Sequence, residues 1–220
     1  PHAMRESVGR IIETLRSVRK QKKIFLFLIA FFFFIDGVYT IIDMATAYGS
    51  ALGLDSTGLL LALLVTQFVA FPFSILFGRL AEKYDTGKLI LTCIAAYTGI
   101  TVFAVFMKAQ WQFWVLAIFV GMFQGGIQAL SRSYFAKIVP PERSGEYFGL
   151  MDICGKGASF MGTTVVGLTS QAFGSINIGV SAIVFLFLAG ALFFMKTEHS
   201  GSESTKNQEN VIMEQQMFHD

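Results

Sequence analysis

The chain has 220 residues, of which 54% are hydrophobic and only 15% charged. Soluble globular domains usually carry about 25% charged residues, so this composition argues against a water-soluble domain. The formal net charge of +2 gives no global field that would favour nucleic acid as a partner. All three histidines, His2, His199 and His219, lie near a terminus. The apolar body therefore lacks the usual base of serine or cysteine hydrolases.

The chain begins with a polar segment that has one apolar face. We interpret residues 1–4 as a cloning remnant. Within 5–23, apolar residues recur at helical spacing: Val8, Ile11, Ile12, Leu15 and Val18. Seven basic residues share the segment: Arg5, Arg10, Arg16, Arg19, Lys20, Lys22 and Lys23. Such a basic amphipathic helix is expected to lie on an anionic membrane surface, and a soluble linker helix is the alternative.

Six apolar segments follow, near 24–48, 57–78, 88–108, 111–131, 147–170 and 175–195. Each has about twenty residues or more, which is enough to cross the hydrocarbon of a bilayer. Backbone polar groups in lipid must be satisfied within the segment, so each segment is predicted to be a helix. The fold expected is an all-α integral membrane bundle over 24–196. The polar tail, 197–220, is expected to be disordered.

The charges in the loops predict the orientation of the bundle. Loops on the side of the basic start carry Arg79, Lys83, Lys88, Arg132, Lys137 and Arg143. Loops on the other side and their flanks carry one basic residue, Lys108. Basic residues accumulate in cytoplasmic loops, so both termini are predicted to be cytoplasmic in a multi-pass protein of the cell membrane.

Four charged residues lie inside the predicted spans: Asp36, Asp43, Asp152 and Lys156. Charges within the membrane are costly and usually functional. Asp36 and Asp43 are seven residues apart and share one face of the first span. These carboxylates could bind a cation, take up a proton or hold a substrate amine, although Asp43 could simply lie at the membrane interface.

The fifth span carries Asp152 and Lys156 at i and i+4, the spacing of a helical ion pair. The pair is either structural or a site for a zwitterionic or anionic solute, with Lys156 receiving a carboxylate. In the fourth span, Gln124, Gln128 and Arg132 form a polar stripe.

Arg132 and Gln67 each have two interpretations. Arg132 is either a positive anchor at the membrane surface or part of a cytoplasmic gate with Glu146 or Glu82. Gln67 in the second span is either a solute contact or a contact between helices.

The loop after the second span resembles the cytoplasmic motif of the major facilitator superfamily, Gly-x-Leu-Ala-Asp-Arg-x-Gly-Arg-Lys. Gly78, Leu80 and Ala81 match it, Glu82 and Lys83 are conservative replacements, and Asp85 stands where the second glycine belongs. The resemblance implies that Glu82 and Lys83 stabilise one gated state and do not bind substrate.

A second stretch is more specific. It runs Gly125-Gly126-x-Gln128-Ala129-Leu130-Ser131-Arg132-Ser133-Tyr134-Phe135-Ala136-Lys137, followed by Pro140, Gly145-Glu146-Tyr147-Phe148-Gly149 and Gly155-Lys156. It resembles the C-terminal half of the vacuole-effluxer-like branch of that superfamily, whose eukaryotic members are linked to amino-acid efflux during autophagy. The resemblance covers about 24–196 and implies that 5–23 is the central linker.

That resemblance implies half of a twelve-span transporter. The chain is then either a fragment or a half-size protein, and it needs an N-terminal half or a second copy as partner. The expected function is transport of a small polar solute, amino acids first, by alternating access. The candidate cavity residues are Asp36, Gln67, Gln128, Asp152 and Lys156, and the candidate gating residues are Glu82, Lys83, Arg132 and Glu146.

Two other functions have weaker support. An intramembrane protease is disfavoured because no span contains a histidine and no Gly-x-Gly-Asp motif occurs. The alternative to transport is a membrane scaffold or assembly subunit. Cys93 and Cys154 have no spacing typical of a metal site, and no metal, cofactor or enzymatic activity is expected.

Overall fold

The structure, a computed structural model, describes residues 15–217, with side chains to residue 200. The suggested cloning remnant, 1–4, and residues 5–14 of the basic segment lie outside the described residues. The described part is helical throughout, starting with a short helix over 15–20. The elements that follow are α2 (Lys22–Ala51), α3 (Ser56–Lys83), α4 (Thr86–Val105), α5 (Gln110–Ile138), the 3-10 turn η1 (Pro141–Arg143), α6 (Ser144–Phe173) and α7 (Ile176–Met217).

Five of these helices are long and apolar enough to cross a membrane: α2, α3, α4, α5 and the Ile176–Ser200 part of α7. They correspond to five of the six predicted spans. The remaining prediction, 147–170, lies inside α6, which has 30 residues and is long enough to span. Glycines, threonines, Asp152 and Lys156 lower the hydropathy of α6, which is why it is not among the five.

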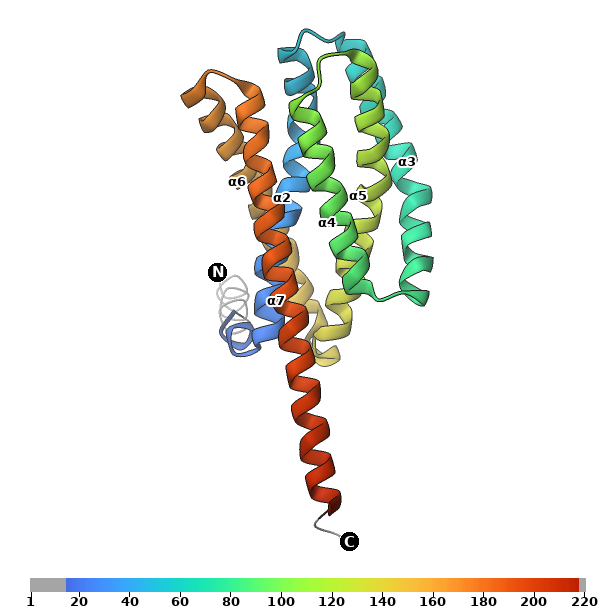
Figure 1. The fold of residues 1–220 in the computed structure, drawn as a ribbon, viewed down its shortest axis with the longest axis vertical. Helices are drawn as coiled ribbons and strands as arrows, with labels where there is room; N and C mark the ends of the chain where they lie inside the picture. Colours follow the sequence, from blue (N-terminus) through green and yellow to red (C-terminus); the bar gives the residue numbers. More distant parts are fainter. Residues whose placement is uncertain (1–14, 218–220) are drawn as a thin grey trace, which may run out of the picture.

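The helices run alternately up and down in one bundle (Figure 1). α2 packs against α6 and α7, α5 packs against α3 and α4, and a contact between α4 and α7 joins the two groups. α2, α4 and α6 begin at the end of the bundle where α3 and α5 finish. We call this the basic end, because Arg79, Lys83, Lys88, Lys137 and Arg143 lie there. Lys108 lies at the opposite end. The basic residues of the loops therefore gather at one end of the folded bundle, as the sequence predicted.

A cluster of aromatic rings forms the core near the basic end. The Phe27 ring lies 5.2 Å from that of Tyr134 and 5.3 Å from that of Phe135, and it meets Phe194 edge-on. Phe27 is fully buried. The cluster joins α2, α5 and α7, so it holds together two of the three helices that surround the candidate site, α2 and α5.

α7 continues beyond the bundle to Met217 (Figure 1). The sequence analysis expected disorder over 197–220, and the structure instead shows a helix over most of that tail. Elongating a helix that has already nucleated costs much less than starting one, which accounts for the difference. Residues 218–220 lie outside the described part.

The structure also explains the departure of Asp85 from the superfamily motif. Asp85 is the N-cap of α4, and its carboxylate accepts a hydrogen bond from the Lys88 N–H at 2.9 Å. A capping carboxylate satisfies one of the free N–H groups at the start of a helix. A glycine would allow the turn but would supply no such acceptor.

α5 approaches α3 through two glycines four residues apart. A Cβ on Gly121 would lie 2.6 Å from the Thr66 carbonyl oxygen, and one on Gly125 would lie 2.5 Å from the Ala70 carbonyl oxygen. Both obstacles are backbone atoms, which a rotamer change cannot move. Small residues at this spacing let membrane helices pack closely.

We therefore expect Gly125→Ala to push α3 and α5 apart and to destabilise the protein by about 1–3 kcal/mol. Gly99→Ala on α4 is the control, because a Cβ there meets open space. Thermal unfolding in detergent or nanodiscs compares the two variants. Equal melting temperatures for both would contradict the close packing of α3 on α5.

Candidate functional site

A cavity of about 200 Å³ lies between α2, α5 and α6. Apolar and aromatic side chains of α2 form one wall, and polar or charged side chains of α5 and α6 form the others. The lining residues are Phe31, Ile35, Tyr39, Gln128, Arg132, Met151, Asp152, Gly155 and Lys156. Three of the five candidate cavity residues, Gln128, Asp152 and Lys156, therefore lie together, and the candidate gating residue Arg132 joins them.

An ion pair crosses this cavity from α5 to α6. Arg132 Nη2 lies 2.8 Å from Asp152 Oδ1, and both side chains are about half exposed, at 56% and 49%. The structure thus differs from two sequence expectations. Asp152 does not pair with Lys156 on its own helix, and Arg132 does not pair with Glu146 or Glu82, because the long arginine side chain reaches across to the neighbouring helix.

Lys156 lines the same cavity without an ion pair to any carboxylate among the described residues. The Lys156 side chain is exposed in this structure. Among the described residues, the walls therefore carry two cations, Arg132 and Lys156, against one anion, Asp152. This excess of one positive charge favours a ligand that brings a carboxylate or another anion.

Asp36 lies outside the cavity walls, buried between α2 and α6. It is fully buried, and its Oδ1 accepts hydrogen bonds from the Gly162 N–H at 2.8 Å and from the Thr40 hydroxyl at 3.4 Å. Its Oδ2 is buried and has no hydrogen-bond partner among the described residues. A buried carboxylate oxygen without a partner is costly, so this position is a candidate for binding a proton.

Gly162 makes room for that carboxylate. A Cβ at Gly162 would lie 2.5 Å from Asp36 Oδ1 and would overlap the Thr40 hydroxyl. A second contact joins the same helices: Ser159, three residues before Gly162 on α6, donates a hydrogen bond of 2.9 Å to the exposed Asp43, seven residues after Asp36 on α2. The contact between α2 and α6 is therefore polar at both places, and Asp36 and Thr40 are fully buried in it.

Gln67 is not brought to the cavity. Its side chain is exposed on α3, beside a small apolar pocket that Ile41 and Ala45 of α2 also line. The prediction for Gln67 depends on polarity alone, and polarity does not say which way a helix face points. The five candidate residues therefore divide into three at the cavity, Asp36 behind it and Gln67 outside it.

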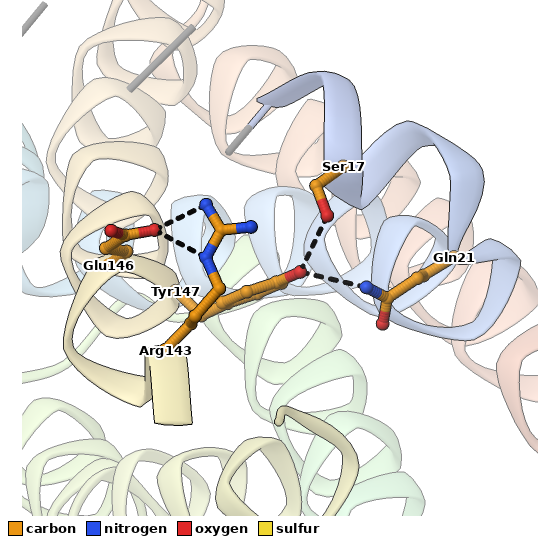
Figure 2. Close-up of polar contacts among 5 residues, drawn as sticks. All are labelled: Ser17, Gln21, Arg143, Glu146 and Tyr147. Atoms are coloured by element: carbon orange, nitrogen blue, oxygen red, sulfur yellow. Dashed lines mark hydrogen bonds and ion pairs between the residues drawn. The ribbon is translucent and has the colours of Figure 1, made fainter. Parts of the chain in front are cut away.

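The candidate gating residues are spread over the basic end. Glu82 and Lys83 are exposed at the end of α3, and no ion pair to either occurs among the described residues. Glu146 accepts two hydrogen bonds from Arg143, from Nε at 3.0 Å and from Nη2 at 2.7 Å (Figure 2). This local pair fixes the start of α6.

Two tyrosines on the helices that form the site, Tyr39 and Tyr147, are not among the candidate site residues of the sequence analysis. Tyr39 lines the cavity, and Tyr147 at the start of α6 is fully buried. Gln21 Nε2 donates to the Tyr147 hydroxyl at 2.9 Å, and the Ser17 hydroxyl lies 3.2 Å from it (Figure 2). Tyr39 lies between Asp36 and Asp43 on the same helix, and this position in the sequence could have identified it as a site residue.

Comparison with known proteins shows the family of this chain. The family described as "Vacuole effluxer Atg22 like" matches residues 2–206. The chain belongs to this family. It is 43% identical over 212 residues to a Bacillus subtilis protein named "Uncharacterized MFS-type transporter YxiO", covering 96% of this chain and 50% of that protein.

Fungal members of the family are more distant. Autophagy-related protein 22-2 of Aspergillus clavatus is 27% identical over 214 residues, which cover 86% of this chain and 34% of that protein. Autophagy-related protein 22 of Cryptococcus neoformans is 26% identical over 198 residues, with 82% and 35% covered. The chain thus spans from about a third to half the length of these curated relatives. It is a multi-pass membrane protein of a transporter family.

Proposed function

We propose that this chain is the C-terminal half of a transporter that moves a small polar solute by alternating access. The observation that carries the proposal is the charged cavity between α2, α5 and α6 in a largely apolar bundle. Charges at membrane depth are typical of a substrate pathway. Membership of the Atg22-like family and similarity to an MFS-type transporter support the same function.

We infer that the solute carries a carboxylate, with amino acids as the first class to test. Lys156 has no ion-pair partner among the described residues, and the cavity walls have one positive charge in excess. Asp152 could receive the amino group of a zwitterion once Arg132 has turned to the carboxylate. A charge-assisted hydrogen bond of this kind contributes about 1.5–3 kcal/mol.

The proposal includes α6 as the sixth span, with the basic end in the cytoplasm of a cell membrane. It also includes a partner half, either an N-terminal half or a second copy. Arg132 and Asp152 are half exposed within this bundle, and facing lipid would be expensive for both. Covering them with a second half would turn an open cavity into an enclosed one, with Glu82, Lys83 and Glu146 at its cytoplasmic rim.

The test is solute exchange by the complete transporter in proteoliposomes, with a panel of labelled amino acids. We expect Lys156→Ala to weaken the apparent affinity for the transported solute about tenfold or more. Lys88→Ala is the matched control, because Lys88 is exposed at the start of α4 and away from the cavity. Uptake that is unchanged by Lys156→Ala would contradict the assignment. If the transporter exchanges none of the solutes in the panel, the result would favour the scaffold function.

A further inference from the structure

A second and larger cavity lies beside the short helix over 15–20. It is a groove of about 630 Å³ between this helix, α2 and α6. Its α2 wall includes Phe25 and Ile29, and its α6 wall consists of Leu150 and Cys154. No described residue lines both this groove and the cavity proposed for transport.

The short helix is firmly attached at this place. Val18 is 2% exposed, and Gln21 and Ser17 hold the hydroxyl of the buried Tyr147 (Figure 2). Tyr147 belongs to α6, so these contacts fix the helix across the start of α6. The groove therefore has a defined third wall, formed by Leu15, Val18 and Arg19.

The groove is apolar along its length and cationic at its end. Arg19 is the one charged residue among the described residues that line it. Residues 15–23 contain five basic residues and no acidic one: Arg16, Arg19, Lys20, Lys22 and Lys23. None of the five has a carboxylate within 4 Å in the described part of the chain. Their charges are thus available to an anion at the membrane surface.

We propose that this groove binds one anionic phospholipid, with an acyl chain along α2 and the phosphate at Arg19. An apolar channel ending in cations matches an amphiphile with a negative head group. The position also fits, because the basic end of α2 is where the chain enters the membrane and where anionic head groups gather. A small polar solute would find no hydrogen-bonding partners along Phe25, Ile29 and Leu150. This proposal stands whether or not the neighbouring cavity transports a solute.

The bound lipid would touch both the short helix and α6. Leu150 and Cys154 lie on α6 within one turn of Asp152, which pairs with Arg132 in the other cavity. Occupancy of the groove would therefore favour the arrangement of α6 seen here. Lipid composition would then influence the charged cavity through the position of one helix.

The test uses phospholipid probes with a photoreactive acyl chain, one with a phosphatidylglycerol and one with a phosphatidylcholine head group. The complete protein is reconstituted with each, irradiated, and digested for mass spectrometry. We expect the anionic probe to label peptides covering 25–33 and 150–154 more than the zwitterionic probe does. Arg19→Gln should reduce this preference about fivefold, the contribution typical of one basic residue at an anionic surface.

Arg79→Gln is the matched control, since Arg79 is an exposed basic residue at the same end of the bundle but outside the groove. It should leave the labelling unchanged. Equal labelling by both probes would overturn the proposal. Labelling spread evenly over exposed apolar residues such as Phe68 and Phe71 would do the same, as would protection of the groove by residues 5–14 or by another protein segment.

Discussion

Gly162→Ala is expected to separate α6 from α2 and to lower the stability of the protein by about 1–3 kcal/mol. The alanine Cβ would occupy the space of the Asp36 carboxylate and the Thr40 hydroxyl. Neither group can leave easily, because both are fully buried. The hydrogen bond from the Gly162 N–H to Asp36 would be lost at the same time, leaving a buried carboxylate with weaker compensation.

Gly157→Ala provides the comparison on the same helix. A Cβ at Gly157 meets nothing within 4 Å, so this variant should keep or slightly raise stability through better helix propensity. Thermal unfolding in nanodiscs measures both. If Gly162→Ala melts no lower than Gly157→Ala, the close contact between α2 and α6 does not hold in the membrane.

Asp36→Asn is expected to abolish proton-driven accumulation of solute while leaving exchange across the membrane intact. The substituted amide would keep an oxygen to accept the Gly162 N–H, so the packing of α2 on α6 should survive. The amide could not take up and release a proton, the role for which Asp36 is a candidate because its buried Oδ2 has no partner among the described residues. Accumulation against an imposed pH gradient and counterflow without a gradient separate the two activities in proteoliposomes.

Asp43→Asn is the control for this experiment. Asp43 lies on the same face of α2, accepts a hydrogen bond from Ser159, and is exposed. It should affect accumulation much less than Asp36→Asn does. Normal accumulation by Asp36→Asn would show that Asp36 is a structural residue, whereas loss of both accumulation and exchange would place it in substrate binding.

The helices were predictable because the membrane sets their length. Five apolar segments of about twenty residues correspond to helices long and apolar enough to span. α6 shows the limit of this signal. Asp152, Lys156 and the glycines make α6 a candidate for function, but they also lower its hydropathy. The prediction that α6 spans the membrane therefore depends on its length and its packing against the other helices, because its hydropathy alone does not indicate a span.

The cavity was only partly predictable, because sequence spacing describes one helix at a time. The i, i+4 rule placed Asp152 beside Lys156, but it cannot describe an arginine that reaches from α5 to α6. Likewise, Gln67 has the right polarity on a helix whose face points outward. The position of Asp36 depends on Gly162, which is 126 residues away in the chain.

The pair between Arg132 and Asp152 weakens the binding of any solute whose carboxylate has to displace Asp152 from Arg132. Asp152 is a carboxylate fixed beside the guanidinium, so it acts as a tethered competitor for any solute carboxylate at Arg132. A tethered group of this kind has an effective concentration on the order of millimolar or above. A solute must therefore be abundant, or gain further contacts at Lys156, before it displaces Asp152.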